Sequence, residues 1–389
     1  MIGKCLLWVV VFCFTQSNIS ALTNSSVISN LKSRMHTLPN GGSLIKSFSD
    51  HSQSYIYDQS LAIITFSRHG DKKTAGKLLL GLKNLQNSDG SLYFSYYLNG
   101  KSPYPIEGDK RFAGAIAWVA LSAATYQKIF HTTEFLSFNN QLLTYLSSQI
   151  RTVSIKGNQI KALAFAPNDI LETSWNENEV AALEHNLDAY SAFSQFAKIN
   201  KVKKYEEIAR ELKDFAIALW DESRSHFWSG VNLKTGAINK SELYLDNQSW
   251  SMLALDKETV QTLKIKTALE MNCEQFLMED KEIKGFMDRK PTNRPSEEKY
   301  VWSEGSAGQI LAMKKYHLLQ NERPYCLGVN QEKLTDEIKK MVTNDGGIAY
   351  ATIKNSDFTT SSSVAGTAWY YFIANSINPF NPEDQLSIE

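Results

Sequence analysis

The 389-residue chain lacks the features that mark several common classes of protein. Lysine plus arginine and aspartate plus glutamate both number 41, so the formal net charge is zero. A balance of this kind favours neither nucleic acid nor an anionic surface as a partner. The CxxC and HExxH spacings typical of zinc sites are missing from the sequence,. We therefore expect no nucleic-acid partner, no metal site and no cofactor.

Long hydrophobic runs are also missing. The longest apolar stretch, Cys5 to Phe14, has ten residues, whereas a helix that spans a bilayer needs roughly 20. Lys4 precedes this stretch and Ala21 offers a small residue for cleavage, as in a secretory signal,. The sequence predicts a signal peptide at residues 1–21 and a single domain at residues 22–389. We expect a secreted or periplasmic protein without stable membrane insertion, and an uncleaved anchor is the competing interpretation.

Cysteine is scarce in the part of the chain that would remain after cleavage. Two of the four cysteines, Cys5 and Cys13, lie in the predicted signal peptide, which leaves Cys273 and Cys326. Export permits a disulfide between them. Their positions in the sequence do not show that they are close in space, so a pair of buried free thiols is an equal alternative.

Helical segments occur in pairs along the remainder of the chain. The predicted pairs are Tyr57–Arg68 with Lys72–Gln86, Phe112–Ile129 with Glu134–Ile150, Val180–Ile199 with Lys203–Trp220, Gln248–Leu255 with Glu258–Met278, and Ser303–Tyr316 with Glu332–Met341. The last segment, Ser363–Asn375, is left to pair with the N-terminal Val27–Met35. Together these segments predict six helical hairpins.

The two members of each pair differ in charge. The first member Phe112–Gln127 contains no charged residue, whereas the second member Lys203–Trp220 is rich in lysine and glutamate. Helices that carry little charge are buried, and helices rich in charge have a face in water. Six hairpins that alternate in this way predict an all-α (α/α)6 toroid. Short turns rich in aromatic residues and glycine, or small hairpins, would lie at one end of it.

Acidic residues lie at or near the starts of four of the predicted inner helices. They are Asp58, Glu184, Asp188, Asp246 and Glu304. Any one of them is explained by helix capping or by the helix dipole. Parallel inner helices begin at the same end of a ring, so the five carboxylates would gather there. Flanking aromatic residues and a histidine suit a sugar-binding mouth, and two carboxylates can carry out glycoside hydrolysis.

These patterns give each candidate residue a predicted role. Glu184, Asp246 and Glu304 are the predicted catalytic acids. The predicted substrate-binding residues are Asp58, Tyr57, Asp188, His185, Tyr190, Trp250, Trp302 and Arg111. If the protein were a lyase, His185 and Tyr190 would be the candidate bases, and Arg111 and Asn186 would neutralise a uronate.

Short segments spread over residues 55 to 380 resemble one superfamily. They are Tyr57–Ala62, Gln86–Ser91, Glu184–Tyr190, Leu245–Trp250, Trp302–Gly305 and Ala365–Trp369. The chain resembles the six-hairpin glycosidase-like superfamily, whose members fold as (α/α)6 toroids. The resemblance implies a carbohydrate-active enzyme with an oligo- or polysaccharide substrate, and it carries no subfamily's catalytic residues over to this chain.

Several functions are compatible with this resemblance. We expect a secreted glycoside hydrolase. A polysaccharide lyase or a sugar epimerase on the same fold is the enzymatic alternative, and a non-catalytic glycan-binding toroid is the alternative from another class. Terpenoid cyclases also use helical toroids, but their DxDD motif is missing from this sequence.

Overall fold

The computed structural model describes residues 22–104, 109–167, 177–291, 299–381 and 386. The predicted signal peptide, residues 1–21, lies outside this range. None of the helices in the described residues combines the length and the hydrophobicity needed to cross a bilayer.

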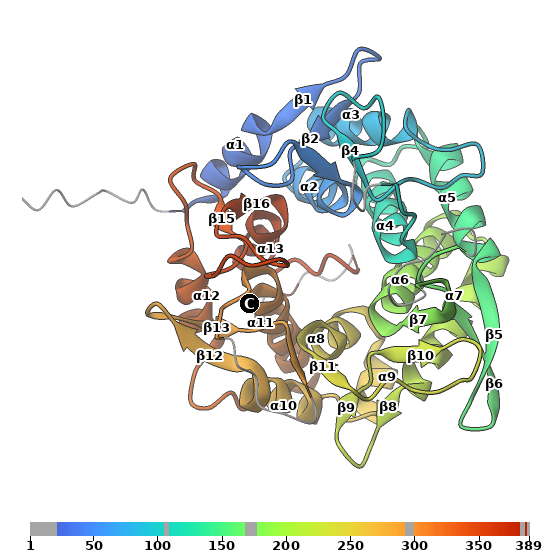
Figure 1. Ribbon diagram of the computed structural model, residues 1–389, viewed down its shortest axis with the longest axis vertical. Helices are drawn as coiled ribbons and strands as arrows, with labels where there is room; N and C mark the ends of the chain where they lie inside the picture. The colour runs from blue at the N-terminus through green and yellow to red at the C-terminus, as the bar shows by residue number, and fades with distance from the viewer. Residues whose placement is uncertain (1–21, 105–108, 168–176, 292–298, 382–385, 387–389) are drawn as a thin grey trace, which may run out of the picture.

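Two concentric rings of helices form the body of the protein (Figure 1). The inner helices are α2 (Ile56–Arg68), α4 (Ala113–Phe130), α6 (Leu183–Asn200), α8 (Leu245–Ala254), α11 (Ser303–Gln320) and α13 (Val364–Ala374). The outer helices are α1 (Asn24–Ser33), α3 (Lys72–Lys83), α5 (Leu136–Ser148), α7 (Lys203–Ala218), α9 (Lys257–Thr262), α10 (Lys266–Phe276) and α12 (Gln331–Lys339). The structure thus confirms the predicted (α/α)6 toroid.

The division into inner and outer helices follows from the distribution of apolar residues. Every residue of α4 from Ala113 to Tyr126 is buried, because this helix packs against neighbours on all sides. In contrast, α7 buries one stripe that includes Tyr205, Leu212 and Phe215 and leaves its charged face in water. A stripe with helical spacing is what an outer helix needs in order to cover the inner ring.

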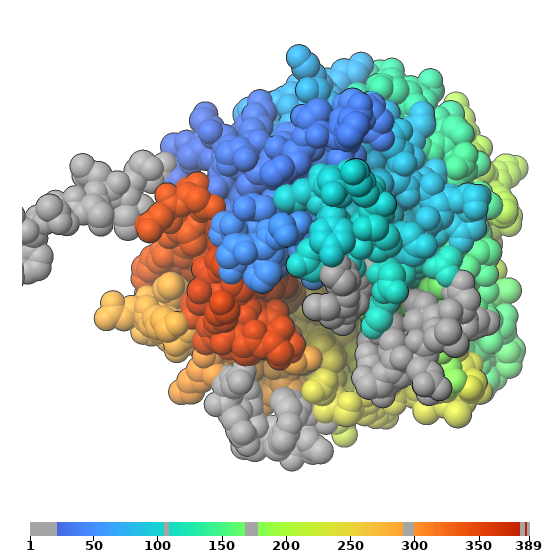
Figure 2. All heavy atoms as spheres, turned by 45° about the horizontal axis from the view of Figure 1, so that its top comes forward, coloured from blue at the N-terminus to red at the C-terminus, as the bar shows by residue number. Residues whose placement is uncertain are grey.

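The ring closes through contacts between the two ends of the chain. Each inner helix packs against the next, and α13 packs against both α2 and α1. On the surface, the N-terminal part (blue) adjoins the C-terminal part (red), as Figure 2 shows. The predicted pairing of Val27–Met35 with Ser363–Asn375 is therefore confirmed.

Sixteen short strands in the described residues form two-stranded antiparallel sheets. The pairs are β1 (Met35–Thr37) with β2 (Ser43–Ile45), β3 (Gln53–Tyr55) with β4 (Ser95–Tyr97), β5 (Ile150–Ile155) with β6 (Asn158–Leu163), β7 (Val180–Ala182) with β10 (Gly230–Asn232), β8 (Trp220–Asp221) with β9 (His226–Phe227), β11 (Glu242–Tyr244) with β14 (Arg289–Pro291), β12 (Leu277–Asp280) with β13 (Ile283–Phe286), and β15 (Ile348–Ala349) with β16 (Ser362–Ser363). Strands β3, β7, β11 and β16 each end at the residue before an inner helix. They therefore fix the point at which the helices α2, α6, α8 and α13 begin.

Two predicted helices differ from the observed ones. The predicted helix Glu258–Met278 is divided into α9 and α10, because Lys264 between them adopts a left-handed conformation with φ +53°. The predicted helix Val180–Ile199 begins at Leu183 instead, because Val180–Ala182 pairs with β10 as a strand. In the second segment the tertiary context overrides a local helical pattern,.

The segment after α13 closes one end of the ring. Phe380 is 1% exposed, and its ring centroid lies 4.9 Å from that of Trp118, 5.5 Å from that of Trp250 and 6.5 Å from that of Trp369. The side-chain amide of Asn378 donates a hydrogen bond to the carbonyl oxygen of Leu253 at 2.9 Å. The lumen therefore has an aromatic floor.

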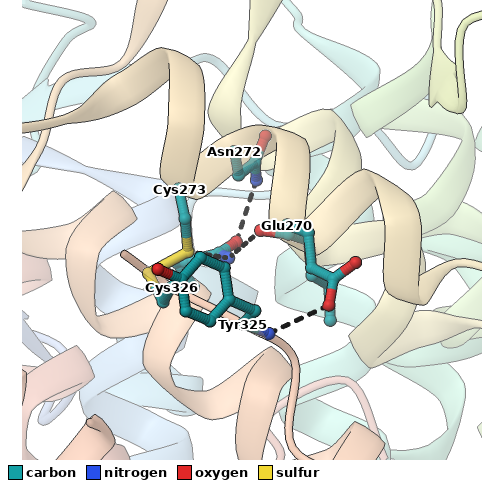
Figure 3. The surroundings of a disulfide bond; sticks show 7 residues. Glu270, Asn272, Cys273, Tyr325 and Cys326 are labelled. Carbon is teal, nitrogen blue, oxygen red and sulfur yellow. Dashed lines mark hydrogen bonds between the residues drawn. A yellow bond between two sulfur atoms is a disulfide. The ribbon is translucent and has the colours of Figure 1, made fainter. Parts of the chain in front are cut away.

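A disulfide joins Cys273 of α10 to Cys326 in the segment after α11 (Figure 3). Beside it, the backbone N–H of Tyr325 donates to Oε1 of Glu270 at 3.0 Å. The structure thus decides between the two alternatives that the sequence left open for these cysteines.

Candidate active site

A cavity of about 790 Å³ lies at the end of the ring where the inner helices begin. The carboxylate residues that line it are Asp58, Glu184, Asp188, Glu304 and Asp357. Its aromatic lining consists of Phe48, Tyr55, Tyr57, Phe94, Tyr104, Phe112, Trp118, Phe165, Trp250, Tyr350 and Phe358. Acids and aromatic rings therefore meet at one mouth, as the sequence predicts.

The residues at the top of the lumen occupy equivalent places in successive inner helices. The second residue of each inner helix is, in ring order, Tyr57, Gly114, Glu184, Asp246, Glu304 and Ala365. The residues just before α2, α6, α8 and α11 make no side-chain capping bond. These acids are thus first-turn residues rather than N-caps.

A second layer follows one helical turn deeper, because residues i and i+4 share a helix face. Its members are Leu61, Trp118, Asp188, Trp250, Gly308 and Trp369. The rings of Trp250 and Trp369 stack with their centroids 6.0 Å apart at an interplanar angle of 6°. The second layer therefore presents one carboxylate among three indoles.

Glu304 is held by a chain of hydrogen bonds. The hydroxyl of Tyr57 donates to Oε1 of Glu304, and the indole N–H of Trp369 donates to the Tyr57 hydroxyl at 3.0 Å. Glu304 is 3% exposed. Its burial raises its pKa to about 8, although the hydrogen bond from Tyr57 works in the opposite direction,. Glu304 is therefore a protonated acid near neutral pH.

Asp58 lies in the first turn of α2 and is similarly buried. Desolvation raises its pKa to about 7, against the lowering effects of a hydrogen bond from Ser47 and of the positive charge of Arg34,. The backbone N–H of Ala365 also favours its ionised form. This carboxyl group therefore changes charge near neutrality at the edge of the cavity.

Glu184 and Asp246, on the adjacent helices α6 and α8, share a hydrogen bond and titrate as a pair,. Burial and the charge of Glu184 raise the pKa of Asp246 well above its usual value. The pKa of Glu184 is lowered. Desolvation alone would raise this pKa, but the hydrogen bond and the charge of His185 and the hydrogen bond from Asp246 together outweigh desolvation. The pair therefore places an ionised Glu184 at the cavity and a protonated Asp246 beside it.

His185 supports this ionised carboxylate. Its Nε2 lies 3.4 Å from Oε1 of Glu184, and its ring stacks on that of Phe165 with a centroid distance of 3.9 Å. A Cβ atom added at Gly114 would lie 2.3 Å from Cδ2 of His185. Only glycine at this position leaves room for the histidine ring.

Asp188 is the buried carboxyl group of the second layer. Desolvation raises the pKa of Asp188 well above its usual value, with further contributions from the charges of Glu184 and Asp246. Its Oδ1 and the Nε1 of Trp250 are buried without a hydrogen-bond partner among the described residues. Buried polar groups are normally paired, and the indole of Trp118 is a hydrogen-bonding neighbour of the Asp188 carboxyl group.

The structure separates the predicted site residues into two groups. Seven of them line the cavity: Tyr57, Asp58, Glu184, His185, Asp188, Trp250 and Glu304. Asp246 lies behind Glu184, and Tyr190, Trp302 and Arg111 are outside the lining of the cavity as the described residues define it. The guanidinium of Arg111, expected near the mouth, instead forms an ion pair with Asp89 at 3.0 Å, because both side chains meet at the surface.

Several lining residues were not among the predicted ones. Trp118 belongs to the second layer, and a comparison of the six inner helix starts at spacing i, i+4 would have identified it. Tyr350 and Phe358 come from the segment between β15 and β16, where the sequence shows an aromatic turn but not which ring faces the lumen. Trp302 contacts both of these rings edge-on and so supports the wall of the cavity.

Similarity to known proteins is confined to structure. No protein-family model matches the chain, and no curated protein sequence matches it. Among solved structures it is similar to a family 8 endoglucanase from Klebsiella pneumoniae, with a TM-score of 0.56, 13% identity, and coverage of 90% of this chain and 99% of the other. It is also similar to a family 76 α-mannanase from Bacteroides thetaiotaomicron, with a TM-score of 0.62, 12% identity, and coverage of 90% and 93%.

A third similar structure catalyses a different kind of reaction. It is a D-mannose isomerase, with a TM-score of 0.66, 12% identity, and coverage of 90% of this chain and 94% of the other. These neighbours are members of the six-hairpin glycosidase superfamily, and the chain has their fold. At these identities the likeness shows the fold alone, so the reaction must be argued from the site.

Proposed function

We propose that the protein is a glycoside hydrolase acting on an oligo- or polysaccharide, with Glu304 as the general acid and Glu184 as the base. The observation that carries this proposal is the opposite protonation of these two carboxyl groups at one cavity: the pKa of Glu304 is raised to about 8 and that of Glu184 is lowered. Two carboxyl groups whose surroundings shift their pKa values in opposite directions can serve as an acid and a base.

The proposed reaction is the transfer of a glycosyl group to water. Glu304 gives its proton to the glycosidic oxygen as the bond from this oxygen to the anomeric carbon breaks. Glu184 takes a proton from the water that attacks the same carbon. Asp246 donates a hydrogen bond to Glu184 and so acts as a positioning residue in this scheme.

The remaining lining residues would bind the sugar. The indoles of Trp118 and Trp250 offer apolar faces, and Asp58 and Asp188 offer oxygens for sugar hydroxyl groups. Such a mixture of aromatic faces and a few polar groups is typical of a small-ligand site. In this scheme Trp302 supports the wall of the site through Tyr350 and Phe358, and Tyr190 has no part in direct binding.

A second candidate function is isomerisation or epimerisation of a sugar. It is favoured by two histidines in the cavity lining, each next to a carboxylate: His185 with Glu184 at 3.4 Å and His51 with Asp50 at 2.8 Å. Two acid–base groups of this kind can remove and return a proton on a sugar. A polysaccharide lyase has less support, because Arg111 is paired with Asp89 at the surface.

A glycan panel distinguishes these functions. The purified protein is assayed for release of reducing sugar, for absorbance at 235 nm from an unsaturated uronate, and for isomers formed from free monosaccharides. Hydrolysis predicts the first signal, and its loss in Glu304→Gln and Glu184→Gln. Glu207→Gln, on the exposed face of α7, is the matched control. Binding without any product in all three assays would indicate a glycan-binding toroid.

We also propose that the protein is exported and that its mature form begins near Leu22. The disulfide between Cys273 and Cys326 supports an oxidising compartment,. The charge and apolar pattern of residues 1–21 supports a cleaved signal,. N-terminal sequencing of the native protein tests this, and a protein that keeps Met1 in the cytosol contradicts it.

A further inference from the structure

In the described part of the chain, the cavity is closed by a floor at one end. Below the second layer, Phe380 fills the space between Trp118, Trp250 and Trp369 and is itself 1% exposed. Within the described residues, the lumen of the ring is therefore a pocket closed at the level of this floor. A ligand that reaches the carboxylates at the top of the inner helices must enter from that end.

One side of this pocket is a wall made by the segment from Lys354 to Thr359. Phe358 is 7% exposed and packs against Tyr300 and Tyr350 with centroid distances of 4.8 Å and 5.6 Å. An ion pair of 2.5 Å between Asp357 and Arg289 holds the same segment from outside. The wall is thus anchored on both faces and bounds the pocket on this side in the described part of the chain.

The size and the charge of the pocket restrict its ligand further. Its volume of about 790 Å³ is within the range of small-ligand pockets, about 300–1,000 Å³,. Asp58, Glu184, Asp188 and Glu304 line it and are all buried or half-buried. Glu184 is the ionised member of this set, so a carboxylate on the substrate would add a like charge beside it in a site screened from water.

We propose that this pocket takes the uncharged terminal sugar of a glycan chain, so that the enzyme removes sugars from a chain end instead of cutting inside it. This inference rests on the proposed function, since it concerns the substrate of the same site. Asp188 and Trp250 line the pocket one helical turn below the mouth and are the residues that the terminal sugar would meet there.

The test uses whichever glycan the panel identifies, in four matched forms. They are the linear oligosaccharide, the same chain with its terminal hydroxyl groups capped, a macrocycle of the same linkage, and the linear chain with its terminal sugar oxidised at C6 to a uronate. We expect the linear chain to release a product of a single size at early times. The capped chain and the macrocycle should react at least about 10-fold more slowly, and so should the uronate.

Two variants connect this result to the wall. Phe358→Ala removes an anchor of the segment and should increase the share of internal cleavage, whereas Thr360→Ala, exposed just after this segment, should leave the product sizes unchanged. A mixture of product sizes from the unaltered enzyme, or equal rates on the macrocycle or the uronate, overturns the inference while leaving hydrolysis intact.

If no glycan is turned over, binding of the same four forms is followed by tryptophan fluorescence. Equal binding of capped and uncapped chains then overturns the inference, and no binding overturns both proposals.

Discussion

The indole N–H of Trp369 donates a hydrogen bond to the hydroxyl of Tyr57 across 3.0 Å. This bond occupies an acceptor site of the hydroxyl, so that the proton of Tyr57 is directed to Oε1 of Glu304,. Residues from α13 and α2 thus orient a carboxyl group on α11. Trp369 also hydrogen-bonds with Glu304 itself, so it positions this carboxyl group both directly and through Tyr57.

Replacing Trp369 with phenylalanine should weaken this arrangement while keeping an aromatic ring. We expect kcat/KM to fall by about 10-fold, the effect of losing one hydrogen bond to a group that acts on a carboxylate. Tyr57→Phe removes the bond that lowers the pKa of Glu304, so the alkaline limb of the pH–rate profile should move to higher pH. An unchanged profile in Tyr57→Phe would show that Glu304 is not the acid. Trp220→Phe, outside the cavity, is the control.

Substitutions of Glu184 and Asp246 should have unequal effects. Glu184→Gln removes the base and should lower kcat by about 100- to 10,000-fold. Asp246→Asn keeps a donor toward Glu184 and should retain activity to within about 10-fold, whereas Asp246→Leu removes the donor and should lose much more. A loss in Asp246→Asn as large as that in Glu184→Gln would make Asp246 itself a catalytic residue. Unchanged melting temperatures are required of all three variants.

The buried acids should make stability depend on pH in a defined direction. Folding raises the pKa of Glu304 from 4.5 to about 8 and that of Asp58 from 3.8 to about 7. The folded protein therefore holds protons that the unfolded chain has lost, so stability falls as pH rises from about 4 to about 8. Glu304→Gln and Asp58→Asn should melt at a higher temperature than the unaltered protein at pH 8 and at nearly the same temperature at pH 4. Equal melting differences at both pH values would contradict the raised pKa values.

Loss of the disulfide should destabilise the fold without changing the site. Cys273 and Cys326 are separated by 53 residues in sequence, and a cross-link of this kind typically contributes about 2–4 kcal/mol. Replacing both with serine should lower the free energy of unfolding by this amount, as measured by denaturant titration under oxidising conditions. The product profile should remain the same, because the disulfide joins α10 to the segment after α11 and neither cysteine lines the cavity. Equal stability of the two forms would show that the bond does not form in solution.

The toroid and the gathering of acids were predictable because both follow from periodicity. Charge-poor and charge-rich helices alternate along the chain, and a closed ring of parallel inner helices brings the starts of these helices to one end. Asp58, Glu184 and Glu304 could therefore be assigned to one mouth from their places in the sequence. The strand Val180–Ala182 was not predictable in this way, since it depends on pairing with Gly230–Asn232, which is distant in sequence. The break at Lys264 depends on a left-handed backbone conformation that the helical pattern does not reveal.

The sequence by itself determined the architecture of this protein and the end of the ring at which chemistry can occur. Only the tertiary structure decided what each carboxyl group can do, because protonation depends on burial and neighbours. Glu184 and Asp246 occupy the same place in adjacent helices, yet His185 stabilises the charge of Glu184, and Asp246 lies behind it and keeps its proton. Likewise, the sequence suggests Arg111 as a residue that could bind a substrate, whereas in the structure it forms an ion pair with Asp89. Helical spacing places a residue on a face, whereas its pKa and its partner come from the groups that the fold places around it.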